Sequence, residues 1–122
     1  MKNRITYALG IPLMWAILLI ASSAFAHSFP VEQDPSAGQT LAAAPGAVMI
    51  KYDAKIEQLF AKLEVLDADG KNVASDPVVS ANGYVLSVKL PPLKPGSYKV
   101  KWGVVCVDTH HTQGSYSFTV GG

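Results

Sequence analysis

The fold that this sequence predicts depends on one stretch, Lys94-Pro95-Gly96-Ser97-Tyr98-Lys99-Val100-Lys101-Trp102-Gly103-Val104-Val105-Cys106-Val107. It opens as a turn, because proline fixes φ and the glycine after it tolerates positive φ. Alternation follows, with one face made of Tyr98, Val100, Trp102, Val104 and Cys106. A period of two residues is that of a strand with one buried face. The stretch therefore predicts a long strand over residues 98–107.

Shorter segments on the N-terminal side repeat this alternation. Residues 48–53 and 84–90 each place apolar side chains at every second position, and Pro91-Pro92 ends the second segment because proline has no amide proton for a ladder. Residues 115–120 form a closing strand. Turn signals separate these segments, notably at 34–38 and 67–70. Short strands at such spacing predict an antiparallel sandwich or a small barrel.

Residues 55–66 fit two patterns. Their first apolar residues, up to Leu63, have helical spacing, whereas Ala61, Leu63 and Val65 alternate with charged residues as in a strand. The short length and the turn that follows favour a loop or single turn over residues 54–58 and then a strand.

The start of the chain has the parts of a secretory signal peptide. Two basic residues precede an apolar run at 11–20, and Ala24-Phe25-Ala26 is a small-residue pattern that signal peptidase accepts. The sequence therefore predicts a signal peptide over residues 1–26 and an exported mature domain over residues 27–122. The alternative is an uncleaved membrane anchor, because the apolar stretch approaches the roughly 20 residues that a spanning helix needs.

The composition of the mature part excludes several classes of protein. Without 26 of the 122 residues, 96 remain, enough for one small domain with one core. Two of the 10 basic residues lie in the leader, which leaves 8 against 9 acidic residues and no basic patch for nucleic acid or a membrane surface. Cys106 is the single cysteine, so no internal disulfide forms. We expect it to be a small buried hydrophobe.

The residues that carry chemistry lie where the strand pattern breaks. Asp108 and His110 follow the long strand two positions apart, so an extended backbone would place both side chains on one side, with Cα atoms roughly 7 Å apart. After cleavage, His27 would offer its amine and Nδ1 to the same ion. Two imidazoles, one amine and one carboxylate suit Cu(II), with zinc as second choice. The sequence thus predicts one Cu(II) site at His27, Asp108 and His110.

Each predicted ligand also has an interpretation without metal. His27 would then only follow a cleavage site, Asp108 would form a turn through its own backbone, and His110 would be an exposed loop histidine. The three histidines of the chain, however, all lie at the mature terminus or in one loop. That grouping favours a metal site. His111 is a weaker candidate ligand, because we expect its side chain to point the other way.

Several motifs of the mature chain resemble those of the CopC family of periplasmic copper-binding proteins. They are His27 at the mature terminus, Pro35-Ser36-Ala37-Gly38, Pro95-Gly96-Ser97-Tyr98-Lys99-Val100-Lys101-Trp102, and Asp108-Thr109-His110. The terminal histidine together with Asp-Thr-His is the specific part.

The resemblance implies an all-β fold, namely a seven-stranded immunoglobulin-like Greek-key β-sandwich or barrel. It implies that the terminal amine, His27, Asp108 and His110 hold one Cu(II) ion. The implied role is that of a periplasmic copper carrier or buffer in copper homeostasis or resistance, beside an inner-membrane copper-uptake protein or other periplasmic copper proteins. Such a protein binds without turnover and has no catalytic residues, so it is not an enzyme.

Three positions depart from the family pattern. Many members have a methionine-rich loop that binds Cu(I), whereas the mature chain has only Met49, so we expect a single Cu(II) site. Members commonly show aromatic-Ser-Glu where this chain has Tyr52-Asp53-Ala54, which makes Asp53 the candidate acid near the metal. His111 replaces a proline that often follows the ligand histidine.

Two other functions remain open from the sequence. An N-terminal histidine chelate also serves copper redox enzymes such as polysaccharide monooxygenases, although a domain of this size leaves little room for a broad substrate surface. A metal-free immunoglobulin-like interaction module would need neither His27 nor His110.

Copper binding would weaken at low pH, because imidazole and α-amine, with reference pKa values of about 6.5 and 7.7–8.0, must be deprotonated to bind.

Overall fold

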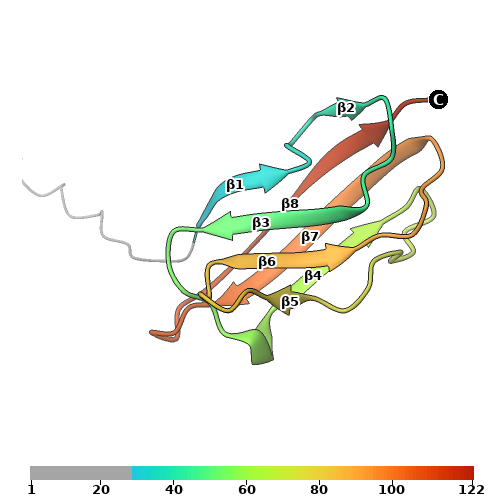
Figure 1. Ribbon diagram of the computed structural model, residues 1–122. Coiled ribbons are helices and arrows are strands. Elements are labelled where there is room, and N and C mark those ends of the chain that lie inside the picture. Colours follow the sequence, from blue (N-terminus) through green and yellow to red (C-terminus); the bar gives the residue numbers. More distant parts are fainter. Residues whose placement is uncertain (1–28) are drawn as a thin grey trace, which may run out of the picture.

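The computed structural model describes residues 29–122, which form two four-stranded β-sheets packed face to face (Figure 1). One sheet has the strand order β1-β3-β6-β5 and the other β2-β8-β7-β4. The all-β sandwich predicted from the sequence is confirmed. In chain order the elements are β1 (Pro30–Asp34), β2 (Thr40–Leu41), β3 (Ala47–Tyr52), the 3-10 turn η2 (Gln58–Phe60), β4 (Lys62–Leu66), β5 (Val78–Val79), β6 (Val85–Lys89), β7 (Gly96–Val105) and β8 (His111–Val120).

The long strand predicted from the sequence forms the centre of its sheet. β7 pairs antiparallel with β8 from Gly96↔Val120 to Val105↔His111 and with β4 on its other side. Every residue of its predicted inner face is buried, and the most exposed, Trp102, has an exposed fraction of 9%. The facing sheet contributes apolar residues from β3 and β6, namely Val48, Ile50, Tyr52, Leu86 and Val88.

Aromatic contacts between and within the sheets fix the packing of the core. Tyr52 meets Trp102 edge to face, with ring centroids 5.5 Å apart, and Tyr98 stacks on Phe118 at 5.6 Å. Gly114 lies opposite Trp102 in the β7–β8 ladder, and a Cβ there would come within 2.7 Å of the indole ring. Only glycine therefore leaves space for the indole at this position.

The described residues contain eight strands, one more than the family resemblance implies. Two of the eight, β2 and β5, have only two residues each and lie at sheet edges. β2 pairs in parallel with the end of β8. A two-residue strand has no measurable alternation, so the sequence pattern had no means of indicating either one.

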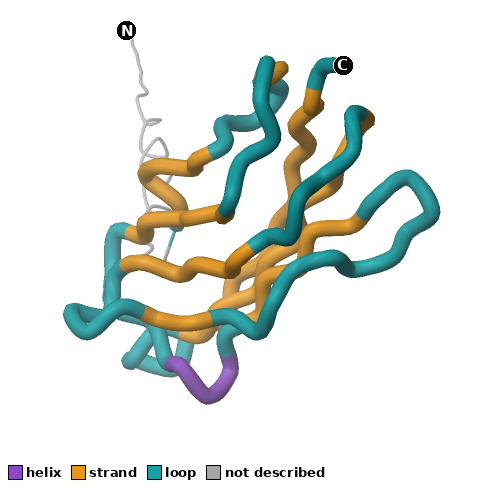
Figure 2. Tube along the Cα trace, turned by 45° about the vertical axis from the view of Figure 1, so that its right-hand side comes forward, coloured by secondary structure: helices purple, strands orange, loops and turns teal. Residues whose placement is uncertain are grey.

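Residues 55–66, which fit both a helical and a strand pattern, adopt the predicted turn and strand. η2 is a single 3-10 turn and β4 follows it at once. Leu59 is 82% exposed and Phe60 55% exposed, so the helical spacing of these side chains does not reflect a buried face. Figure 2 shows this turn beside the loops at one end of the sandwich. Within the described part of the chain, no helix has the length and apolar character to cross a membrane.

Candidate metal centre

Asp108 and His110 lie in the tight turn that joins β7 to β8. Two backbone hydrogen bonds of 2.8 Å close the turn, from the Thr109 N–H to the Cys106 carbonyl and from the Cys106 N–H to the His110 carbonyl. Thr109 has a φ of 78°, which is rare for a β-branched residue. The backbone between the two predicted ligands is therefore bent, and the expectation of an extended backbone is wrong.

The side chain of Asp108 stabilises this bend. Its Oδ1 accepts a hydrogen bond from the backbone N–H of His110 at 3.2 Å, a contact that aspartate favours in turns. The same oxygen lies 3.2 Å from Nδ1 of His110. The bend thus brings the two side chains into direct contact, closer than an extended strand would. Asp108 is a turn former, and it also touches the candidate ligand.

The contact between Asp108 and His110 lies at the surface, where the two side chains are 53% and 52% exposed. The backbone hydrogen bond from His110 and then the contact with its ring lower the pKa of Asp108 below its usual value. The carboxylate is therefore ionised at neutral pH. When Nδ1 of a histidine donates to a carboxylate, the lone pair available to a metal is on Nε2. The geometry fits Asp108 as a group that orients His110.

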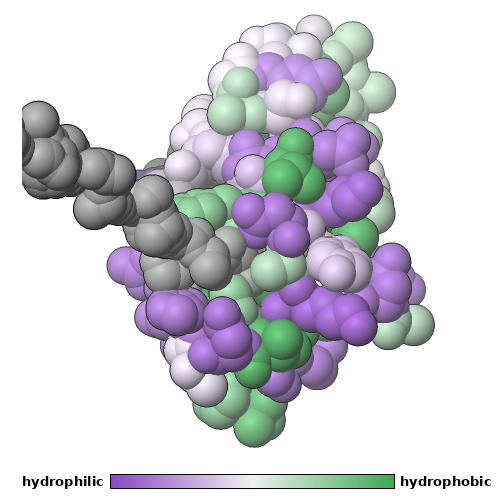
Figure 3. Space-filling view, turned by 90° about the vertical axis from the view of Figure 1, so that its left-hand side faces the viewer, coloured by the Kyte–Doolittle hydropathy of each residue, from purple (hydrophilic) through white to green (hydrophobic). Residues whose placement is uncertain are grey.

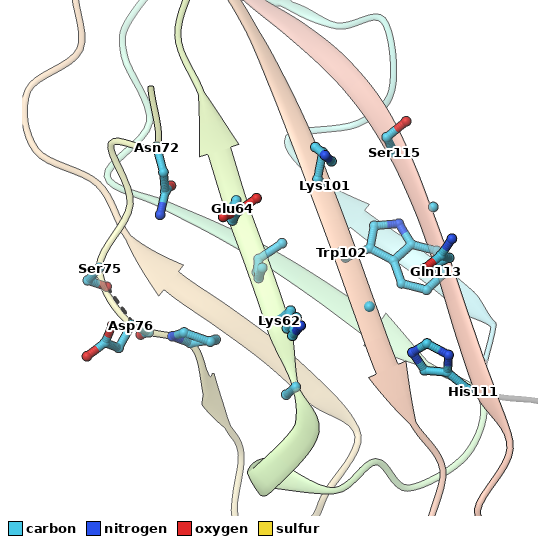
Figure 4. Close-up of a pocket in the computed structure, with 15 residues that line it drawn as sticks. Lys62, Glu64, Asn72, Ser75, Asp76, Lys101, Trp102, His111, Gln113 and Ser115 are labelled. Atoms are coloured by element: carbon cyan, nitrogen blue, oxygen red, sulfur yellow. Dashed lines mark hydrogen bonds between the residues drawn. The ribbon is translucent and has the colours of Figure 1, made fainter. Parts of the chain in front are cut away.

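His111 lies on a strand, outside the turn that holds His110. It begins β8, opposite Val105, so β8 starts earlier than the predicted closing strand. Figure 4 shows its ring on the same strand as Gln113, at a surface hollow of about 770 Å³ that Lys62 also lines. The two adjacent histidines thus have different surroundings.

Cys106 is buried at the base of the turn, with an exposed fraction of 2%. It forms a backbone bridge with Ile56, in the connection between β3 and β4. The prediction that Cys106 is a small buried hydrophobe is confirmed.

The predicted ligand His27 lies outside the described residues, but the chain two residues later is firmly attached near the turn. The Phe29 N–H donates to Oδ1 of Asp53 at 2.8 Å. The Val107 N–H donates to the Lys55 carbonyl at 3.1 Å. Residues 53–56 therefore connect the first described residue to the β7–β8 turn. Figure 1 shows both at the same end of the sandwich, and Figure 3 shows mainly hydrophilic side chains on that face.

The described residues alone do not complete a metal site. Within residues 29–122, no three His, Cys, Asp or Glu side chains lie close enough together to hold an ion. Asp108 and His110 supply at most one carboxylate and one imidazole. Any metal bound here needs further donors from the preceding residues or from water. The link between Asp53 and Phe29 was not evident from the sequence, because an aspartate after a strand usually indicates only a turn.

Comparison with known proteins identifies relatives of this chain. Residues 30–121 match the family model described as the CopC domain. Copper resistance protein C of Xanthomonas campestris pv. juglandis is 33% identical over 116 residues, which cover 88% of this chain and 91% of that protein. Copper transport protein CutJ of Bacillus subtilis is 29% identical over 115 residues, which cover 88% of this chain but 21% of that protein.

A solved structure supports the same relationship. The crystal structure of CopC from Methylosinus trichosporium OB3b matches with a TM-score of 0.74 and 35% sequence identity, and the match covers 78% of this chain and 94% of that one.

Proposed function

The chain belongs to the CopC family, and on that basis we propose that it binds one Cu(II) ion and acts as a copper carrier or buffer in copper homeostasis or resistance. It acts by binding and release, without turnover. A relative named copper resistance protein C, similar over most of both chains, supports this role. The observation that carries the proposal is the contact between Asp108 and His110 at the end where the described chain begins.

The proposed ligands are the α-amine and ring of His27 and the Nε2 atom of His110. Asp108 orients His110, and binding by its second carboxylate oxygen is the alternative. The position of Phe29 supports the inclusion of His27. Phe29 is held at the end of the sandwich where the β7–β8 turn lies (Figure 1), and His27 precedes it by two residues, which span at most about 7 Å. Nitrogen donors, with or without one carboxylate oxygen, suit Cu(II) better than the other common divalent ions.

The proposed ligand set requires removal of the leader. Cleavage after Ala26 would release the domain of residues 27–122 into the periplasm and leave His27 with a free α-amine. The amine and Nδ1 could then close a chelate ring on copper. The signal peptide over residues 1–26 is thus part of the proposal.

The proposed partners are an inner-membrane copper-uptake protein or other periplasmic copper proteins. The support is the relative named copper transport protein CutJ, in which the part similar to this chain is only 21% of the protein. In that relative a domain of this kind is covalently joined to a larger protein. We infer that the domain of residues 27–122 exchanges copper with a copper transport protein.

The deciding experiment is a Cu(II) titration with electron paramagnetic resonance on two forms of the protein. One form begins at His27 and the other carries one extra residue before it. We expect the first to bind one Cu(II) with a nitrogen-rich tetragonal spectrum and the second to bind far more weakly, because a peptide bond removes the amine as a donor. Equal, weak binding by both forms would eliminate the terminal chelate.

A further inference from the structure

A reciprocal pair of hydrogen bonds joins Phe29 to Asp53 just before β1. The Phe29 N–H donates to Oδ1 of Asp53 at 2.8 Å, and the Asp53 N–H donates to the Phe29 carbonyl at 3.0 Å. The second bond extends the β1–β3 ladder past the pair Pro30↔Tyr52. The first uses a carboxylate as acceptor, which makes it stronger than a neutral hydrogen bond. Asp53 therefore fixes the backbone of Phe29 at two points.

The residues that follow Asp53 lead directly to the turn with the candidate ligands. The Lys55 carbonyl accepts a hydrogen bond from the Val107 N–H at 3.1 Å, and Ile56 forms a bridge with Cys106. One short segment thus holds Phe29 on one side and the base of the β7–β8 turn on the other. The position of Phe29 relative to Asp108 is set by these backbone contacts.

We propose that Asp53 is a positioning residue for the copper site, because its carboxylate anchors Phe29 and so holds the mature N-terminus beside His110. This inference rests on the proposed function. Without the carboxylate, only the ladder bond from the Asp53 N–H holds Phe29, so part of the Phe29 backbone must be ordered each time His27 binds copper. Ordering the backbone of one residue corresponds to about a 10-fold change in a binding constant. Asp53 was expected to be an acid near the metal, but its Oδ1 binds a backbone amide.

Three proteins that begin at His27 test the inference: the parent chain, Asp53→Ala and Asp53→Asn. The alanine variant removes the carboxylate that accepts from the Phe29 amide, whereas asparagine retains a neutral acceptor oxygen and loses the charge. Asp76→Ala is the matched control, because it removes the same charge from an aspartate whose side chain lines the hollow beside Lys62. Asp53 is exposed, so we expect all four proteins to fold.

Two readouts separate anchoring from other effects. In copper-free protein, we expect the Phe29 amide of Asp53→Ala to exchange with solvent about 10-fold faster than in the parent, as measured by nuclear magnetic resonance. Cu(II) affinity, from competition with a chelator, should fall about 10-fold in Asp53→Ala and much less in Asp53→Asn. The paramagnetic resonance spectrum of the loaded protein should not change, because the ligands are the same.

Each alternative result has a distinct meaning. Unchanged affinity in Asp53→Ala with a freely exchanging Phe29 amide would overturn the positioning role and leave the proposed function intact. Equal losses in the alanine and asparagine variants would also overturn it, since charge alone would then explain the effect. A parent chain that binds no Cu(II) would overturn the proposed function together with this inference.

Discussion

Replacing Gly114 with alanine tests whether Trp102 is as tightly held as the packing indicates. The new Cβ would lie 2.7 Å from Cζ2 and 2.9 Å from Cε2 of the indole, about 0.8 Å short of the separation at which two carbon atoms attract. The indole of Trp102 cannot shift without displacing its neighbours, because its exposed fraction is 9% and its ring packs edge to face on Tyr52. Overpacking of this kind destabilises a domain by about 1–3 kcal/mol.

For a domain of this size, that loss lowers the melting temperature by about 5–20 °C. Thermal unfolding followed by circular dichroism measures the change, and Gly103→Ala is the matched control. Gly103 lies in the same ladder, but its added Cβ would meet only the Gln113 side chain at 3.9 Å, an ordinary contact. We expect the control to be as stable as the parent or slightly more stable. A Gly114→Ala protein that melts with the control would show that the indole is loosely packed.

Three further predictions concern the turn between β7 and β8. His110→Ala should weaken Cu(II) binding at least 100-fold, whereas His111→Ala should change it less than about 3-fold in the same titration, because only His110 contacts Asp108. The folded-state pKa of Asp108 is lowered, so Asp108→Asn should be less stable than the parent at pH values above the unfolded pKa of about 3.9. Urea unfolding at a series of pH values should show that this difference in stability disappears as the pH falls through the folded-state pKa. The thiol of Cys106, buried in the native state, should react with a thiol reagent only after denaturant is added, and fast reaction in native protein would contradict its burial.

The sequence predicted the central strands of the sandwich well, because their side chains alternate over enough residues. Tyr98, Val100, Trp102 and Val104 are buried as expected, and so are Val48 and Ile50 on the facing sheet. Alternation is a direct consequence of burying one face of a strand. Strands of two residues give no such signal, which is why β2 and β5 were not predicted.

The turn at Asp108 was predicted less well, because aspartate both stabilises turns and binds metal ions. An aspartate and a histidine two positions apart indicated a pair of ligands on an extended strand. The structure instead bends the chain at Thr109, with the aspartate bonded to the His110 backbone. The two side chains do lie close together, as the sequence predicted, but a bent backbone produces this closeness and not an extended one. Spacing alone does not separate these cases, since both bring the side chains together.

The proposed copper site also depends on cleavage of the peptide bond after Ala26, a step that the fold of residues 29–122 does not determine. Within residues 29–122, no three His, Cys, Asp or Glu side chains lie close enough together to hold an ion, and Asp108 and His110 alone are too few. Under the proposed ligand set, two of the nitrogen donors come from His27 and exist as a chelate only after cleavage behind Ala26. The precursor would then fold with its turn and its Asp53 anchor intact, yet bind Cu(II) weakly. Copper loading would follow export, in the compartment where the carrier is proposed to act.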